Sequence, residues 1–297
     1  MLSKFALPAI FSAGILWGII SLFLRALTAA GLSVQSLVVA RMILSALFLG
    51  VYLLLFDRRK LRISLKDLWI FAGSGILCLA GFNCCYFYTV TSGYAAIGGV
   101  LLYTSPAFIL FFARLFFKER ITSQKIIALL LMLSGCLLIS GVLFTGQAVP
   151  AMIFVTGIGS GLLYGLYSIF GKIALRKYDA ATIVFYTFLT GSLCDLYFCT
   201  TPELMRAVIQ QPSNLIWLSG CALICSVLPY ILYTWGLKHT TAGRASILVA
   251  VEPLVCTLLG FGVYGEDFSL SKLAGISAVI AAIIILSLPQ KTELISE

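Results

Sequence analysis

Charged residues are scarce in this sequence: they make up 10% of its 297 residues, whereas hydrophobic residues make up 61%. An average soluble domain carries about a quarter charged residues. A soluble protein of this length needs more polar surface than this chain supplies, so a soluble fold, a disordered chain and a coiled coil are excluded. A membrane protein is the class that remains.

Residues typical of catalytic and nucleotide-binding sites are also scarce. The chain has a single histidine, His239, and no DxxxD, HExxH or GxxxxGK[ST] motif. An intramembrane enzyme needs clustered acids, histidine pairs or a nucleophile beside a base, and an ATP-driven pump needs a phosphate-binding loop. The sequence therefore predicts no enzyme, no cofactor and no metal site.

Long apolar runs fill most of the chain, and ten of them are long enough to cross a bilayer as helices. The runs are unbroken, unlike the short alternating strands of a membrane barrel. We therefore predict an all-α membrane protein with ten transmembrane helices. They lie at about residues 5–27, 34–56, 68–90, 94–117, 122–144, 150–174, 181–201, 214–237, 243–264 and 271–289.

Basic residues are distributed unevenly between the two sides of these segments. With a cytoplasmic N-terminus, sixteen of the twenty Lys and Arg lie on the inner side, and Arg25, Arg206 and Lys272 lie on the outer side. Cytoplasmic loops are enriched in Lys and Arg. The net charge of +9 therefore indicates membrane topology rather than nucleic-acid binding. We expect a multi-pass protein of the plasma membrane with both termini in the cytoplasm.

The two halves of the chain match each other at an offset of 147 residues. Each half holds five predicted segments, and because five is odd, the second copy is inverted relative to the first. This predicts two inverted five-helix repeats, residues 1–146 and 147–297, as in secondary transporters with a site near the midplane. The aligned pairs include Trp17 and Tyr164, Arg25 and Lys172, Tyr86 and Tyr233, Pro106 and Pro253, and Glu119 and Glu266.

Several short motifs follow one another in order along nearly the whole chain. They are Trp17-Gly18, Val39-Ala40-Arg41, Tyr103-Thr104-Ser105-Pro106 with Lys118-Glu119-Arg120, and Glu252-Pro253 with Gly265-Glu266. In this combination the chain resembles the ten-span EamA type of the drug/metabolite transporter superfamily. The resemblance implies a transporter of small metabolites or amino acids, often an exporter, and leaves the substrate open.

Glu252 is the ionisable residue nearest the midplane of a predicted segment. Ionisable groups inside a membrane are costly and are therefore candidates for function. The carboxylate can bind a cationic group of a substrate or carry a proton, because burial disfavours its charged form. A structural glutamate, neutral or paired with arginine, is the alternative. Ser105 occupies the aligned position in the first half.

Arg41 and Asp195 are the other two deep ionisable residues. Arg41 can pair with Asp195, pair with Glu252 or bind a substrate carboxylate, and the sequence leaves these alternatives open. The resemblance also implies an arginine at this position. We interpret Asp195, Pro106 and Pro253 as gating or kink residues, because proline removes a backbone donor and bends or breaks a helix.

Aromatic and amide side chains complete the predicted site. Trp17 and Tyr103 lie too deep for an interfacial belt and can stack a ring or enclose a quaternary amine, with helix packing as the alternative. Buried Asn83 bonds a neighbouring helix or lines the path. The predicted substrate-binding residues are Trp17, Arg41, Asn83, Tyr86, Tyr103, Ser105, Tyr164, Tyr233 and Glu252.

These features predict a secondary active transporter, operating as an exporter of small metabolites or amino acids by alternating access through a midplane cavity. A transporter of a cationic or quaternary amine is the first alternative, and a channel or an intramembrane enzyme is a more remote one. The expected partners are a small-molecule substrate, the lipid bilayer and protons as coupling ion. We expect a monomer or a homodimer.

Overall fold

The computed structural model describes residues 2–142, 149–196, 209, 211–265, 267 and 269–288, and within them all regular structure is helical. The predicted boundary between the repeats, Arg206 and Glu266 lie outside the described residues. The α-helices are α1 (Ala6–Gly18), α2 (Ile20–Ala29), α3 (Val34–Phe56), α4 (Leu68–Ala72), α5 (Gly81–Thr89), α6 (Ala95–Leu102), α7 (Ser105–Phe117), α8 (Ser123–Ser140), α9 (Ala151–Ala174), α10 (Ala180–Asp195), α12 (Ser213–Ala222), α13 (Leu228–Lys238), α14 (Ala242–Leu248), α15 (Val251–Tyr264) and α16 (Leu270–Ser287). Short 3-10 turns are η1 (Leu2–Phe5), η2 (Arg58–Leu61) and η3 (Leu65–Asp67), and π-helical turns are η4 (Gly73–Ala80), η5 (Val90–Tyr94) and η8 (Leu223–Val227).

Eight helical stretches are long and apolar enough to cross a membrane, counted over the described residues. The helices α7 and α10 are apolar but shorter. The difference from the predicted ten has two causes. The predicted segment 94–117 is interrupted between α6 and α7, and the described part of the segment 181–201 ends at residue 196. These helices make the chain a multi-pass membrane protein.

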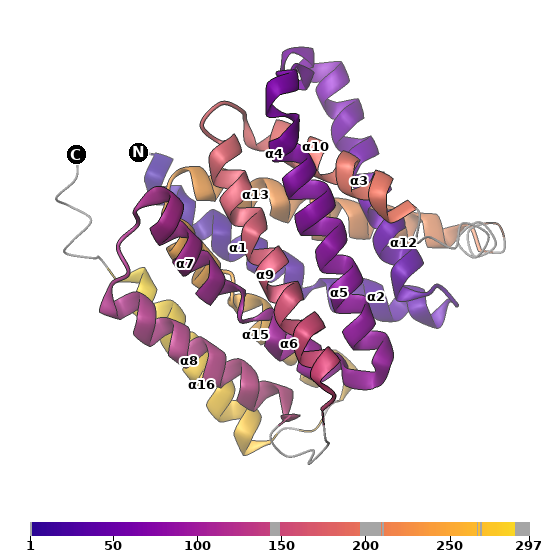
Figure 1. The fold of residues 1–297 in the computed structure, drawn as a ribbon. Helices are drawn as coiled ribbons and strands as arrows, with labels where there is room; N and C mark the ends of the chain where they lie inside the picture. Colours follow the sequence, from indigo (N-terminus) through magenta and orange to yellow (C-terminus); the bar gives the residue numbers. More distant parts are fainter. Residues whose placement is uncertain are drawn as a thin grey trace.

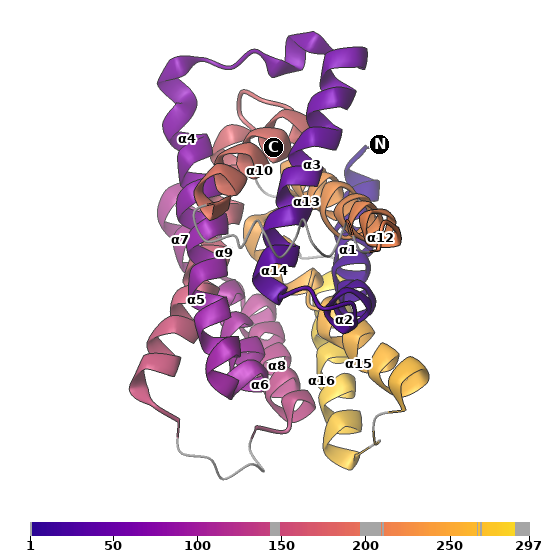
Figure 2. The same ribbon diagram turned by 90° about the vertical axis from the view of Figure 1, so that its right-hand side faces the viewer.

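The helices of the two halves interleave, so each half packs largely on the other (Figure 1). In the contacts between elements, α1 packs against α13 and α3 against α10, whereas α5 packs against α9. The closest partners are α8 and α16, which lie side by side in both views of the ribbon (Figures 1 and 2). Any cavity at the centre of the molecule therefore receives side chains from both halves.

Closely spaced glycines allow α1 and α9 to approach the backbone of other helices. A Cβ atom at Gly18 would lie 2.9 Å from the carbonyl oxygen of Glu252, and one at Gly161 would lie 2.8 Å from that of Leu101. Only glycine fits such contacts, as at other close helix crossings in membranes. The two helices are thus held against the ends of α15 and α6, where the chain is interrupted.

Polar contacts join the two halves at the end of the molecule where α9 ends. The Nζ atom of Lys177 lies 2.8 Å from Oδ1 of Asp67, and the hydroxyl of Tyr178 donates a 2.7 Å hydrogen bond to Oδ2. The Nζ atom of Lys172 lies 2.7 Å from Oε1 of Glu119. In each contact an acid of the first half binds a residue in the last turn of α9 or just after it.

Candidate functional site

Two interrupted helices build the centre of the site. The chain breaks between α6 and α7 and again between α14 and α15, and Pro106 and Pro253 lie in the first turn of α7 and α15. Proline fits the first turn of a helix because its missing N–H would have no partner there. Residues next to both breaks line one cavity.

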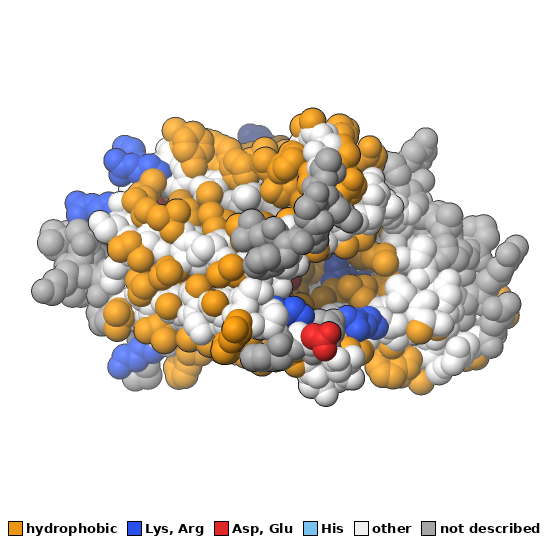
Figure 3. Space-filling view, turned by 90° about the horizontal axis from the view of Figure 1, so that it is seen from below, with side chains coloured by type: hydrophobic (Ala, Val, Ile, Leu, Met, Phe, Trp, Pro, Cys, Tyr) orange, Lys and Arg blue, Asp and Glu red, His pale blue; other side chains and the backbone are white. Residues whose placement is uncertain are grey.

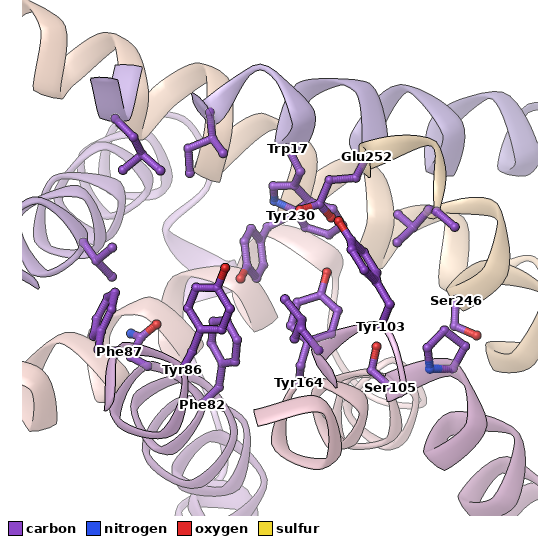
Figure 4. A pocket seen from close by; sticks show the side chains of 18 of the residues that line it. Trp17, Phe82, Tyr86, Phe87, Tyr103, Ser105, Tyr164, Tyr230, Ser246 and Glu252 are labelled. Atoms are coloured by element: carbon purple, nitrogen blue, oxygen red, sulfur yellow. The ribbon is translucent and has the colours of Figure 1, made fainter. Parts of the chain in front are cut away.

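This cavity has a volume of about 180 Å³ and lies between the two halves (Figure 4). Its wall is mostly apolar and aromatic, and Arg41 and Glu252 are the charged residues among the described part of the wall. Pro106 also lines it. Eight of the nine predicted substrate-binding residues line it: Trp17, Arg41, Asn83, Tyr86, Tyr103, Ser105, Tyr164 and Glu252.

The Glu252 carboxylate faces the cavity beside aromatic rings. Figure 4 shows Trp17 and Tyr230 next to it, and Tyr103 extending toward it from the other break. Glu252 is the second residue of α15, where the helix dipole favours a negative charge. Within the described part of the chain, no side chain donates a hydrogen bond to this carboxylate, which leaves it available to a ligand.

Arg41 has no acidic partner among the residues that the structure describes. Its Nε atom is buried without a hydrogen-bond partner, and none of the ion pairs within 4.0 Å among the described residues includes it. Of the three alternatives left open by the sequence, pairing with Asp195 and pairing with Glu252 do not occur here. An unpaired buried donor costs free energy, which a ligand with a carboxylate would recover.

Three predicted site residues, Tyr233, Asp195 and Pro253, lie outside the described wall of this cavity. Tyr233 is 3% exposed, and its hydroxyl shares a 2.7 Å hydrogen bond with Ser168. Its ring centroid lies 5.5 Å from that of Trp17, which lines the cavity. Asp195 accepts a hydrogen bond from Asn83 instead of facing the cavity. Pro253 is buried inside α15.

Sequence reasoning missed Tyr230, which lines the cavity. Its ring centroid lies 5.1 Å from that of Trp17 and 4.9 Å from that of Phe188, so it joins the wall to the aromatic core. The signal was present in the repeat, because the offset of 147 residues aligns Tyr230 with Asn83. Phe82, Phe87 and Ser246 line the cavity as well and were not predicted.

Glu119 holds the helix α14, which carries part of the wall. Its Oε1 atom accepts a 2.9 Å hydrogen bond from the backbone N–H of Ala242, and Oε2 accepts one of 3.4 Å from that of Gly243. The same carboxylate pairs with Lys172, whose Nζ atom also donates to the carbonyl of Thr240. Glu119 therefore both caps the N-terminus of α14 and forms an ion pair with Lys172.

Comparison with known proteins decides the family. The model of the EamA-like transporter family matches residues 4–141 and 151–288. This chain belongs to the EamA-like transporter family. That family is part of the drug/metabolite transporter superfamily, so the resemblance is confirmed and the chain is a membrane transporter.

Individual relatives agree with this family. A protein of Archaeoglobus fulgidus named "Uncharacterized transporter" is 30% identical over 218 residues, which cover 71% of this chain and 75% of the relative. "Uncharacterized transporter YojE" of Bacillus subtilis is 23% identical over 288 residues, 93% of this chain and 91% of the relative. A solved crystal structure superposes with a TM-score of 0.77 at 17% identity and covers 95% of this chain and 96% of its own, a likeness of fold.

Proposed function

We propose that this EamA-like transporter is a secondary active transporter that exports small metabolites or amino acids by alternating access. The observation that carries the proposal is the cavity with Arg41 and Glu252, both unpaired, in an aromatic wall. A zwitterion matches these two charges: its carboxylate would bind the guanidinium and its ammonium the carboxylate. The aromatic rings would receive its side chain.

The internal repeat supports alternating access with ten spans in two inverted copies. The two family matches begin at residues 4 and 151, the same offset of 147 residues as in the sequence. The offset aligns α1 with α9 and α5 with α13. The contacts follow the same symmetry, because α1 packs on α13 and α9 packs on α5. Inverted repeats provide two mirror-related conformations of one chain.

The shape of the molecule supports a state that is open at one end. Seen from below, the face opposite the end of α9 is hollowed, with basic side chains and an acidic one at the hollow (Figure 3). The other end is joined by the contacts of Asp67 and Glu119. With both termini in the cytoplasm of a plasma-membrane protein, the open end is the outer one.

A cationic or quaternary amine is the second candidate substrate. The aromatic rings around Glu252 favour it, since ring faces attract cations. The guanidinium of Arg41 in the same wall would repel a cationic substrate. A zwitterion is therefore the first candidate substrate. We further propose that Glu252 carries the coupling proton, with the transporter acting as a monomer or a homodimer.

Transport into and out of proteoliposomes tests the function, with and without a proton gradient, using amino acids and quaternary amines. We expect gradient-dependent movement of a zwitterion and a loss of about tenfold or more in Glu252→Gln and Trp17→Ala, the scale of about 1.4 kcal/mol of lost interaction. Asp179→Asn, an exposed acid paired with Lys60, is the control that should transport normally. Unchanged rates in both cavity variants would contradict the proposed site.

A further inference from the structure

A second cavity of about 240 Å³ lies beside the central one and contains Asp195. The Asp195 side chain is 3% exposed and lies at the cavity wall with Gln35 and Thr91. Asn83 and Phe87 line both cavities, so the two share a wall. The central site as described above makes no use of Asp195.

Within the described part of the chain, no Lys or Arg neutralises the negative charge of Asp195. Its Oδ2 atom accepts one hydrogen bond of 2.7 Å from Nδ2 of Asn83, and Oδ1 has no partner among the described residues. No Lys or Arg of the described chain lines this cavity or pairs with the carboxylate within 4.0 Å. An unpaired carboxylate inside a membrane protein is costly.

We propose that this second cavity binds a small monovalent cation through the Asp195 carboxylate. A single carboxylate matches a single positive charge, and the polar residues Gln35 and Thr91 line the same cavity. The cation is either an inorganic ion or the ammonium group of a primary amine, since both offer the charge and size that this carboxylate requires. The proposal stands apart from the substrate assigned to the central cavity.

Asn83 connects this site to the central cavity. Its amide donates to Asp195 and lies 3.4 Å from the sulfur of Met42, while its side chain forms part of both cavity walls. A cation bound to the Asp195 carboxylate would fix its position, and with it the hydrogen bond that Asn83 donates to Asp195. Occupancy of the second cavity thus stabilises one arrangement of the central wall.

Thermal unfolding of the purified full-length protein in detergent tests the site. NaCl, KCl or methylammonium chloride replaces N-methyl-D-glucamine chloride at constant pH and ionic strength, so that only the small cation changes. A cation that binds only the folded state raises Tm saturably. We expect such a rise for at least one of the three in the wild-type protein and in Asp179→Asn, and its loss in Asp195→Asn.

The pattern of responses identifies the cation and can overturn the site. A rise with Na⁺ or K⁺ identifies an inorganic ion, and a rise with methylammonium alone identifies an amine. If Asp195→Asn does not fold, Asp195→Glu replaces it, and a shift of at least about tenfold in the half-saturating concentration supports the site, a change of about 1.4 kcal/mol in binding. No rise in the wild-type protein, an equal rise in Asp195→Asn, or an unshifted Asp195→Glu would overturn it.

Discussion

Arg41 and Glu252 line one cavity without forming an ion pair. At the scale of single residues, the absence of this ion pair means that a role in ligand binding and a role in stability predict different effects of substitution. Removing one partner of a buried ion pair costs about 3–5 kcal/mol of stability, because the other charge stays buried without a partner. An unpaired charged group in a cavity wall instead destabilises the ligand-free protein, and a bound ligand offsets this cost. Replacing such a group should therefore weaken ligand binding without lowering the stability of the fold.

Replacing Arg41 by glutamine distinguishes these two roles. Because the Nε atom of Arg41 has no hydrogen-bond partner, we expect Arg41→Gln to unfold at the wild-type temperature or above it. Transport of a zwitterion should fall by about tenfold or more, since a charge-assisted contact to its carboxylate contributes about 1.5–3 kcal/mol. Thermal unfolding and proteoliposome transport are measured on the same preparation. A large drop in Tm would indicate a structural role.

The interrupted helices are the elements that decide where the site lies. Their breaks, between α6 and α7 and between α14 and α15, bring backbone ends and side chains of both halves to one cavity. The prolines after the breaks are compatible with helix starts, and the glycines of α1 and α9 allow the close approach that holds the breaks in place. Packing at these crossings therefore controls the geometry of the site.

An added methyl group at Gly18 tests this packing. The Cβ atom of Gly18→Ala would lie 2.5 Å from Cβ of Val255 and 2.9 Å from the carbonyl oxygen of Glu252, so α1 and α15 must separate. We expect a loss of about 1–3 kcal/mol of stability, typical of overpacking, together with slower transport. Gly262→Ala, on the same helix α15, adds a methyl group with nothing within 4 Å and should leave Tm unchanged or raise it. Equal effects of both variants would argue against the close crossing.

At the scale of the whole molecule, two acids, buried Asp67 and partly buried Glu119, join the two halves at one end. Glu119 of the first half binds Lys172 and the N-terminus of α14, and Asp67 binds Lys177 and Tyr178. A transporter that alternates between two states has to release these contacts in one of them. In the proposed alternating-access cycle, the strength of these contacts therefore contributes to the balance between the two states.

Removal of the Glu119 charge should weaken this connection between the halves. Glu119→Gln loses the pair with Lys172, and we expect a destabilisation of about 1–3 kcal/mol, the cost of leaving a partly buried charge without its partner. The backbone N–H of Ala242 should also exchange faster with deuterated solvent, because its acceptor is weakened. Asp57→Asn removes an exposed pair with Lys60 and serves as the control. Unchanged exchange at α14 would contradict the role of Glu119.

Local patterns in the sequence were sufficient for much of the fold. The apolar run predicted at 34–56 is the helix α3 with the same bounds, because span length and hydrophobicity are read over adjacent residues. The prolines indicated the breaks for a similar local reason. The repeat and the deep ionisable residues selected eight residues that the structure places in one wall.

Contacts between distant segments were decided by the tertiary structure alone. The hydrogen bond between Asn83 and Asp195 depends on how helices of opposite halves face each other, and the one between Ser168 and Tyr233 on how two helices of the second half do. The unpaired Nε atom of Arg41 likewise depends on which neighbours surround it in the folded chain. Periodicity shows that a helix forms and is apolar. Periodicity does not show which neighbour a side chain contacts. In a helix that is apolar on all sides, the sequence does not distinguish the face that packs inward from the others.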